Sequence, residues 1–345
     1  MISFFRKRSP LSIGLIGLGL ISGVHIEAYS RRKDVRVKAI SDSNQANLIK
    51  KGKQLGIDNQ YSDYHFMLQD RSIDVIDVMT PHFLHAQCVI DALSEGFTVI
   101  CEKPLVTTIR DMDRIIQVCK KVRKHVYVKQ YLRFSLAYLK AQELLRKNSI
   151  GRPYFVQCMF TTNSITDYTN PNIWKGNKKE AGGGIFIDVG VHMLDLLQMM
   201  FGQPIATYAQ TRKLLSPLPQ KGEDFATAVI EFPHNLMVNL SCTENDTGYR
   251  FRWEMRLYGT DGIITIMDEG KEAKVLQLIK ENRIISEFTE RNWWIESNVR
   301  AIHDAINRIQ TQRPPEVKLS HIRSVLHTIV QSYKSAQTGK RILLK

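Results

Sequence analysis

The sequence predicts two domains, an α/β domain followed by a domain rich in β-strands. The chain has 345 residues, which is more than a single hydrophobic core usually organises. Between residues 11 and 101, short apolar runs alternate with helical segments, the pattern of a parallel sheet built from βαβ units. Beyond Gly151, segments such as 237–242 alternate apolar and polar residues, as half-buried strands do. We therefore expect domains over residues 1–132 and 133–345.

The composition is that of a folded globular protein. Hydrophobic residues make up 43% of the chain and charged residues 24%, which argues against disordered, collagen-like and membrane-spanning classes. The 48 Lys and Arg outnumber the 34 Asp and Glu, so the net charge is +14. A charge of this size suggests three classes of partner, namely nucleic acid, an acidic membrane surface and an anionic small molecule. Because the basic residues form short groups without a nucleic-acid-binding module, we predict neither a nucleic acid nor a membrane partner.

The cysteines and the N-terminus indicate a cytoplasmic protein. The 5 cysteines include no C-x-x-C pair, and an odd number cannot be fully bridged within the chain. Arg6-Lys7-Arg8 followed by the apolar residues 11–24 imitates a secretory signal. The apolar stretch is too short to cross a membrane, and its glycines have another explanation.

The first domain begins with a strand, a glycine-rich turn and a helix, over residues 11–16, 17–23 and 24–30. Gly17, Gly19 and Ser22 stand where a dinucleotide-binding turn needs a tight bend, a close approach of the backbone to the pyrophosphate, and a small residue. Ser22 departs from the usual glycine or alanine but is still small. The same turn contains Leu20 and Ile21, so we predict that these five residues bind the cofactor.

Asp42 indicates which dinucleotide binds. It follows the second predicted strand, residues 35–40, and lies 20 residues beyond Ser22. An acidic side chain there accepts hydrogen bonds from the ribose hydroxyls and repels a 2′-phosphate, so the sequence favours NAD over NADP. The alternative is that Asp42 serves only as a turn or helix N-cap residue.

The next two predicted strands also end in polar residues. A helix is expected around residues 63–70, before a strand over 75–79. A second helix is expected over 84–95, before a strand over 98–101. Ligands of parallel sheets bind beyond the carboxyl ends of the strands. The residues found there are Thr80, Pro81, His82 and His85 after one strand, and Glu102, Lys103 and Pro104 after the other.

Taken together, these motifs resemble the glucose–fructose oxidoreductase and inositol dehydrogenase family, Gfo/Idh/MocA. The resemblance covers nearly the whole chain. It implies an N-terminal Rossmann domain, a C-terminal α+β domain with a large, mostly antiparallel open sheet, and a homodimer or homotetramer formed by packing these sheets together. The residues that carry it are Gly17, Gly19, Ser22 and His25, Asp42, Thr80, Pro81 and His85, Glu102, Lys103 and Pro104, Arg133 and Phe134, glycines 182–184, Asp188, His192 and Asp195.

The same resemblance implies an NAD-dependent dehydrogenase that oxidises a secondary hydroxyl of a sugar, nucleotide sugar or cyclic polyol. Lys103 would hydrogen-bond the reacting oxygen, and a cis bond before Pro104 is typical of such chains. Asp188 and His192, four residues apart, would share a helical face and form a proton-handling pair with His192 as the base. No third ligand at zinc spacing accompanies them, so no metal is expected.

The sequence also suggests roles for several further positions. Glu102 would contact the cofactor ribose or orient Lys103, and His82 stands where the family most often has asparagine. His25 would pack near the cofactor. Further cofactor contacts are expected from Thr80, Pro81, His82, His85, Glu102 and Lys103, and substrate contacts from Lys103, Arg133, Trp174, Lys175, Asp188 and His192.

Other interpretations stay open at this stage. Tyr168 and Asp195 are as well explained by structural roles, and His85 by packing within a helix. Some of the positive charge, at Arg133, Lys175 or Lys178, favours an anionic substrate. Two functional alternatives are an enzyme that recycles tightly bound NAD within one turnover and a non-catalytic NAD-binding protein of the same fold.

Overall fold

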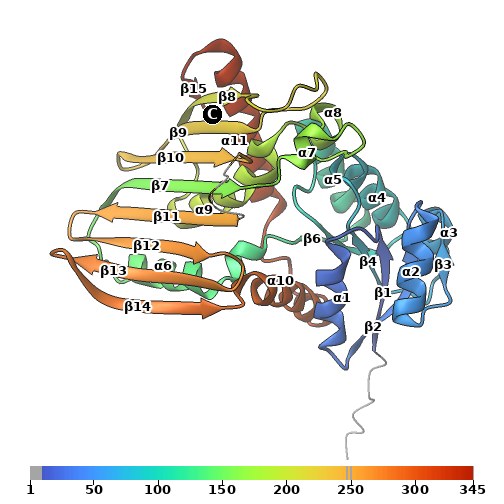
Figure 1. The fold of residues 1–345 in the computed structure, drawn as a ribbon. Helices are drawn as coiled ribbons and strands as arrows, with labels where there is room; N and C mark the ends of the chain where they lie inside the picture. Colours follow the sequence, from blue (N-terminus) through green and yellow to red (C-terminus); the bar gives the residue numbers. More distant parts are fainter. Residues whose placement is uncertain (1–9, 246–247, 249–250, 345) are drawn as a thin grey trace, which may run out of the picture.

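The computed structural model describes residues 10–245, 248 and 251–344, and within them two sheets organise the chain (Figure 1). One sheet has six strands and the other nine. The basic triplet Arg6-Lys7-Arg8 lies outside the described residues. The arrangement confirms the predicted α/β domain followed by a sheet-rich α+β domain.

The six-stranded sheet is parallel throughout, with strand order β3-β2-β1-β4-β5-β6. The strands predicted from apolar runs are observed within a residue or two of their expected bounds, while β3 and β6, of two and three residues, are too short to stand out. The strands are β1 (Leu11–Ile16), β2 (Val35–Ser41), β3 (Gln60–Tyr61), β4 (Val75–Val78), β5 (Thr98–Cys101) and β6 (Val126–Val128). The helices between them are α1 (Ser22–Ser30), α2 (Gln45–Leu55), α3 (Tyr64–Met67), α4 (His82–Ser94) and α5 (Ile109–Val122).

The nine-stranded sheet has the order β14-β13-β12-β11-β7-β10-β9-β8-β15. Neighbouring strands of this sheet pair antiparallel, except that β7 and β10 pair parallel at its centre. This confirms the mostly antiparallel sheet. The strands are β7 (Pro153–Thr162), β8 (Ala206–Arg212), β9 (Phe225–Phe232), β10 (Leu236–Thr243), β11 (Phe251–Gly259), β12 (Gly262–Glu269), β13 (Ala273–Lys280), β14 (Arg283–Arg291) and β15 (Ile342–Leu343).

Helices cover one face of this sheet and leave the other open. On β10, Val238, Leu240 and Cys242 are buried, whereas Met237 is exposed and Asn239 and Ser241 are half-buried, so the predicted alternation of 237–242 is confirmed. The helical elements of this half are η1 (Tyr131–Phe134), α6 (Leu136–Arg146), α7 (Thr166–Thr169), α8 (Lys178–Ala181), η2 (Phe186–Gly190), α9 (Val191–Phe201), α10 (Trp293–Gln310) and α11 (Leu319–Thr338).

Helix α10 packs on the first sheet although its residues come late in the chain. Its buried side chains Val299 and Ile302 join a core cluster with Ile13 and Leu15 of β1. Arg32, just after α1, donates a hydrogen bond of 2.7 Å to Asn307. The parallel domain is therefore completed by a segment that follows strands β7 to β14 of the antiparallel sheet (Figure 1).

One helical segment among the described residues, 178–201, is long and apolar enough to cross a membrane by length and composition alone. In the fold, 83% of its most apolar window is buried inside the protein. A core helix meets the same criterion, and this segment packs against the nine-stranded sheet and α11.

Candidate active site

The glycine turn after β1 adopts a conformation that its sequence requires. Gly17 has a φ of 91°, and an added Cβ would lie 2.8 Å from the backbone of Met79 and Thr80, so only glycine fits there. At Gly19 an added Cβ would meet nothing within 4 Å, and Leu20 beside it is fully exposed. Ser22 is buried and its Oγ donates a hydrogen bond of 2.7 Å to the Gly19 carbonyl. The turn is thus closed toward β4 and open on its outer side.

A cavity of about 330 Å³ adjoins this turn at the carboxyl ends of the parallel strands. A cavity of this size fits part of a dinucleotide. Thr80 lines it and has a buried Oγ1 with no hydrogen-bond partner among the described residues, so a hydroxyl is free for a bound cofactor. The lining residues are Ile16, Gly17, Ser41, Asp42, Ser43, Ser62, Asp63, Tyr64, Thr80, Pro81, Leu84, Gln87 and Cys88.

Asp42 lies in this cavity with its carboxylate fixed by two backbone groups. The Leu18 N–H donates to Oδ2 and the Asn44 N–H to Oδ1, each at 2.7 Å. The N-cap of α2 is Asn44, whose side chain accepts from Ala46 and Asn47, so Asp42 is not the cap. Its remaining lone pairs can accept hydrogen bonds from ribose hydroxyls. The residues present therefore fit the adenosine side of NAD.

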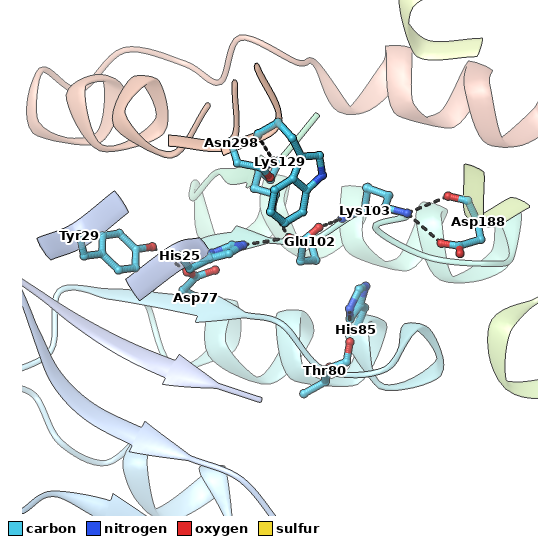
Figure 2. A network of polar contacts seen from close by, with 11 residues as sticks. His25, Tyr29, Asp77, Thr80, His85, Glu102, Lys103, Lys129, Asp188 and Asn298 are labelled. Carbon is cyan, nitrogen blue, oxygen red and sulfur yellow. Dashed lines mark hydrogen bonds and ion pairs between the residues drawn. The ribbon is translucent and has the colours of Figure 1, made fainter. Parts of the chain in front are cut away.

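A buried polar network joins α1 to the end of β5 (Figure 2). His25 lies 2.6 Å from Asp77 Oδ2 and 2.9 Å from Glu102 Oε1, and Tyr29 donates to Asp77 at 2.7 Å. Burial opposes protonation of His25, but Asp77 and Glu102 outweigh it and raise the pKa of the imidazole. The His25 ring therefore links two buried carboxylates, Asp77 and Glu102.

Glu102 is held by three neighbours. Its Oε1 accepts from His25 and pairs with the Lys129 ammonium, while Oε2 accepts from the Lys103 N–H at 3.1 Å. Burial alone would raise the pKa of Glu102, but Lys129 and His25 hold it well below the usual range. Of the two roles expected for Glu102, the observed contacts favour orienting Lys103. The contribution of Lys129 was not visible in the sequence.

Lys103 lies at the carboxyl end of β5 and reaches across to the second domain. Its ammonium donates to the Asp188 carbonyl at 2.7 Å and to Asp188 Oδ1 at 2.8 Å, and its side chain is 16% exposed. The Lys103–Pro104 peptide is cis, as the resemblance implies. The Lys175 ammonium lies 3.2 Å from the other oxygen, Asp188 Oδ2. Burial opposes ionisation of Asp188, yet Lys103 and Lys175 hold its pKa well below the usual range.

Asp188 and His192 lie on a helix that changes its winding between them. Residues 186–190 form a π-turn, η2, and α9 begins at Val191. Such turns are frequent at functional sites. His192 is buried, its ring contacts Tyr131 and Trp253 edge-on, and its Nδ1 has no hydrogen-bond partner in the described part of the chain. Burial, helped by the Lys103 ammonium, holds the pKa of His192 well below its usual value, so the ring is neutral.

The residues after β4 lie beside this group. The His82 ring contacts Trp174 edge-on, with centroids 4.7 Å apart, and burial lowers the pKa of His82 to about 3. His85 places its ring nitrogens 2.9 Å from the Pro104 carbonyl and 2.7 Å from the Thr80 carbonyl. Burial lowers its pKa too, so the neutral ring donates to one carbonyl at a time. His85 thus ties the end of β4 to the Lys103 segment and takes the structural role left open by the sequence.

Arg133 is bound by Asp195, and the substrate contact expected for it stays a prediction. Its Nε and Nη2 donate to the two carboxylate oxygens of Asp195 at 2.6 and 2.9 Å, and both residues are buried. His321 adjoins the same pair. A guanidinium bound on both arms by a buried carboxylate serves to hold η1 against α9. Asp195 has the structural role that was its alternative.

The glycines 182–184 pack against protein. An added Cβ at Gly184 would overlap the backbone of Glu223, and one at Gly182 would overlap Thr107. The Glu223 carboxylate accepts from the Gly184 N–H at 3.0 Å and the Phe186 N–H at 3.1 Å. These glycines therefore let the chain turn tightly into η2. Glu223, which lies 39 residues from Gly184, gave no local signal in the sequence.

Lys221 holds the loop that carries Trp174 and Lys175. Its buried ammonium donates to the carbonyls of Asp167, Ile173 and Lys175 at 2.8, 2.5 and 2.9 Å. Lys175 also pairs with Asp167 at 3.1 Å. Sequence reasoning missed Lys221, because a lone lysine ordinarily indicates a solvated surface charge. Within the described ranges, no group of three or more His, Cys, Asp or Glu side chains is arranged to hold a metal ion.

A glycine turn on a parallel sheet, a cavity beside it and a lysine at the adjoining strand end define a dinucleotide-dependent oxidoreductase. Two family models match the chain in order. One, described as "Oxidoreductase family, NAD-binding Rossmann fold", covers residues 11–130, and the other, "GFO/IDH/MocA C-terminal domain", covers residues 138–265. The chain belongs to the Gfo/Idh/MocA family, and its first domain is an NAD-binding Rossmann domain.

Named relatives and solved structures agree with this assignment. The chain is 26% identical over 314 residues to myo-inositol 2-dehydrogenase of Thermotoga maritima, covering 89% of this chain and 90% of that one. It is 29% identical over 199 residues to D-glucoside 3-dehydrogenase of Escherichia coli, covering 57% and 55%. A structure of levoglucosan dehydrogenase in complex with NADH and levoglucosan has the same fold, with a TM-score of 0.87, 21% identity and coverage of 97% and 100%.

Proposed function

We propose that this oxidoreductase uses NAD to oxidise a secondary hydroxyl group of a neutral sugar or cyclic polyol. The observation that carries the proposal is the Lys103–Asp188 pair, which lies at the carboxyl edge of the Rossmann sheet with the neutral His192 one helical turn beyond Asp188. The names of the relatives, an inositol and a glucoside dehydrogenase among them, support this substrate class.

The charges around Lys103 favour a neutral substrate over the anionic one that the net charge suggested. Lys175 is paired with Asp167 and Asp188, and Arg133 with Asp195. These two cations are therefore already neutralised, and a phosphate or carboxylate would face the same Asp side chains. Lys178 is exposed on the surface.

Each residue of the group has a distinct part in the proposed reaction. NAD, when bound, supplies the hydride acceptor. The Lys103 ammonium hydrogen-bonds the reacting oxygen and stabilises negative charge on it as the proton leaves. Asp188 holds that ammonium in place through its carbonyl and carboxylate. His192 accepts the hydroxyl proton, which a neutral imidazole can do and a charged one cannot. Gly17, Asp42 and Thr80 would hold the cofactor.

The proposal is tested with the purified full-length chain and NAD. We expect myo-inositol, levoglucosan or D-glucose to produce NADH, and NADP to be a poor substitute. The replacement of His192 by Asn should abolish NADH formation while leaving NADH binding intact. No NADH with any member of a broad sugar and polyol panel, or full activity in the His192 variant, would contradict the proposal.

Two alternatives are less well supported. Recycling of bound NAD within one turnover predicts catalysis without added NAD. A non-catalytic protein predicts NADH binding without turnover. The relatives named above are dehydrogenases, which favours neither alternative.

We further propose a cytoplasmic homodimer or homotetramer. The open face of the nine-stranded sheet exposes apolar side chains, Met159, Tyr208 and Met237 among them, and such a surface suits packing against a second copy. The free cysteines among the described residues suit a reducing compartment. Light scattering of the purified chain measures the oligomeric state, and a monomer at micromolar concentration would contradict this part.

A further inference from the structure

Glu244 is a buried acid that was not among the predicted site residues, and it lies next to the predicted site. Glu244 directly follows β10, on whose buried face Val238, Leu240 and Cys242 alternate, and it continues that alternation. This face packs against η2, the turn that contains Asp188. The Glu244 N–H donates to the Asp224 carbonyl at 3.0 Å, which fixes the backbone there. The carboxyl group therefore faces the helical side of the sheet, where the Lys103–Asp188 pair lies.

The Glu244 carboxyl group has hydrogen-bonding capacity to spare. The residue is 1% exposed, and its Oε2 has no hydrogen-bond partner in the described part of the chain. The Tyr168 hydroxyl, also buried, likewise lacks a partner within the described ranges. The two groups are within electrostatic range of each other and of Asp188. Unpartnered buried polar atoms are costly, and they are explained where water or a ligand meets them.

The cations near Glu244 are bound by other carboxylates. Lys175 is held between Asp167 and Asp188, and Lys103 is bound to Asp188. Burial, together with the carboxylates of Asp188 and Asp167, raises the pKa of Glu244 to about 8, against the lowering effect of Lys175. Glu244 is therefore a neutral acid at neutral pH, with one O–H donor and a free acceptor oxygen. Those are the groups that recognise an alcohol, whereas an anion would meet two carboxylates.

We propose that the Glu244 carboxyl group and the Tyr168 hydroxyl form a subsite that binds a hydroxyl group of the substrate beside the Asp188–Lys175 pair. This inference rests on the proposed function and makes Glu244 a determinant of specificity. Gly176 packs closely against Tyr168, because an added Cβ there would lie 2.9 Å from the Tyr168 ring. Glu244 acts on substrate binding and leaves the cofactor cavity at the other sheet untouched.

The test compares E244L, E244Q and Y168F with the wild type on myo-inositol and levoglucosan. For E244L we expect KM to rise about tenfold or more, because a hydroxyl loses its buried partner, with kcat within about threefold. E244Q keeps a donor and an acceptor, so its KM should stay within about threefold of the wild type. NADH affinity should be unchanged in all three. E287L and E287Q, at an exposed glutamate of β14, are the matched controls.

Monodeoxy analogues of the substrate identify the bound hydroxyl. For the analogue that lacks this hydroxyl, the KM of E244L should equal that of the wild type. For the other analogues, the KM of E244L should stay about tenfold above that of the wild type. An unchanged KM in E244L, or a KM in E244Q as high as in E244L, overturns the assignment. If E244L does not fold, Y168F decides, because an unchanged KM there overturns it as well. A wild type that reduces no NAD with the whole panel contradicts the proposed function itself, whereas normal wild-type turnover with these negative results contradicts the subsite alone.

Discussion

The Lys103 ammonium donates hydrogen bonds to two oxygens of one residue, the carbonyl and the carboxylate of Asp188, at 2.7 and 2.8 Å. Lys103 lies just beyond strand β5 of the parallel sheet and Asp188 belongs to the π-turn before α9, so this pair joins the two domains. The double contact fixes the position of the ammonium more tightly than a single ion pair would. We expect the orientation of Lys103 to depend on both domains.

Replacement of Lys103 by Met should reduce kcat about a thousandfold, because the reacting oxygen loses its charged hydrogen-bond donor. The NADH dissociation constant should stay within about twofold. Steady-state kinetics and NADH fluorescence titration measure the two effects. Lys178→Met, at an exposed lysine, is the control and should behave as the wild type. A K103M variant with more than a tenth of the wild-type kcat would show that Lys103 is not essential.

Asp42→Ala should weaken NADH binding about tenfold, because hydrogen bonds to an ionised group are lost. It should also reduce the preference for NADH over NADPH about tenfold or more, since the carboxylate no longer repels a 2′-phosphate. Titration of both cofactors against the wild type measures this, with Asp58→Ala at an exposed aspartate as the control. If the ratio of the NADH and NADPH dissociation constants is unchanged, Asp42 does not contact the ribose of the cofactor.

Acid should destabilise the protein through its buried histidines. The pKa of His82 is about 3 when folded, against 6.5 when unfolded, so the unfolded chain takes up more protons as pH falls below 6.5. Stability from this residue is present above pH 6.5 and declines toward pH 3. Between pH 7.5 and pH 5 the loss is about 2 kcal/mol.

His82→Asn should therefore show a smaller fall in Tm between pH 7.5 and pH 5 than the wild type does. Differential scanning calorimetry at several pH values measures the difference. His125→Asn, at an exposed histidine, should retain the wild-type slope. Equal slopes in His82→Asn and the wild type would mean that His82 is not buried in a neutral form.

Lys221→Met should loosen the loop that carries Trp174 and Lys175, because three carbonyls lose their buried donor. We expect a loss of stability of about 2–4 kcal/mol and faster hydrogen exchange over residues 163–176. Mass spectrometry locates the exchange, and Lys213→Met, at an exposed lysine, is the control. Protection of this loop equal to that of the wild type would refute a holding role for Lys221.

The sequence predicted those parts of the fold that depend on local patterns. Apolar runs located β1, β2, β4 and β5, and the glycine spacing located the turn at Gly17, because both signals lie within a few adjacent residues. The alternation of 237–242 identified β10 for the same reason. The pairing of β7 with β10 joins strands about 80 residues apart, and no local pattern specifies it.

The candidate site shows the same division. Lys103, Asp188 and Asp42 were recognisable because each belongs to a short motif, whereas Glu223, Lys221 and Glu244 each act on residues tens of positions away. The π-turn at 186–190 was missed, since its winding differs from that of an α-helix by less than one residue per turn. Charge partners were equally invisible, and for that reason the pairing of Arg133 with Asp195 was not predicted.

Helix α10 has a consequence for how the protein is made. The ribosome finishes the six strands of the parallel sheet long before it reaches residues 293–310, yet Ile13 and Leu15 belong to one core cluster with Val299 and Ile302 of that helix. The first domain therefore keeps an apolar flank uncovered while strands β7 to β14 of the second sheet are synthesised. It stays incomplete until most of the second domain has been translated, and transiently exposed apolar surface of this kind is what chaperones bind.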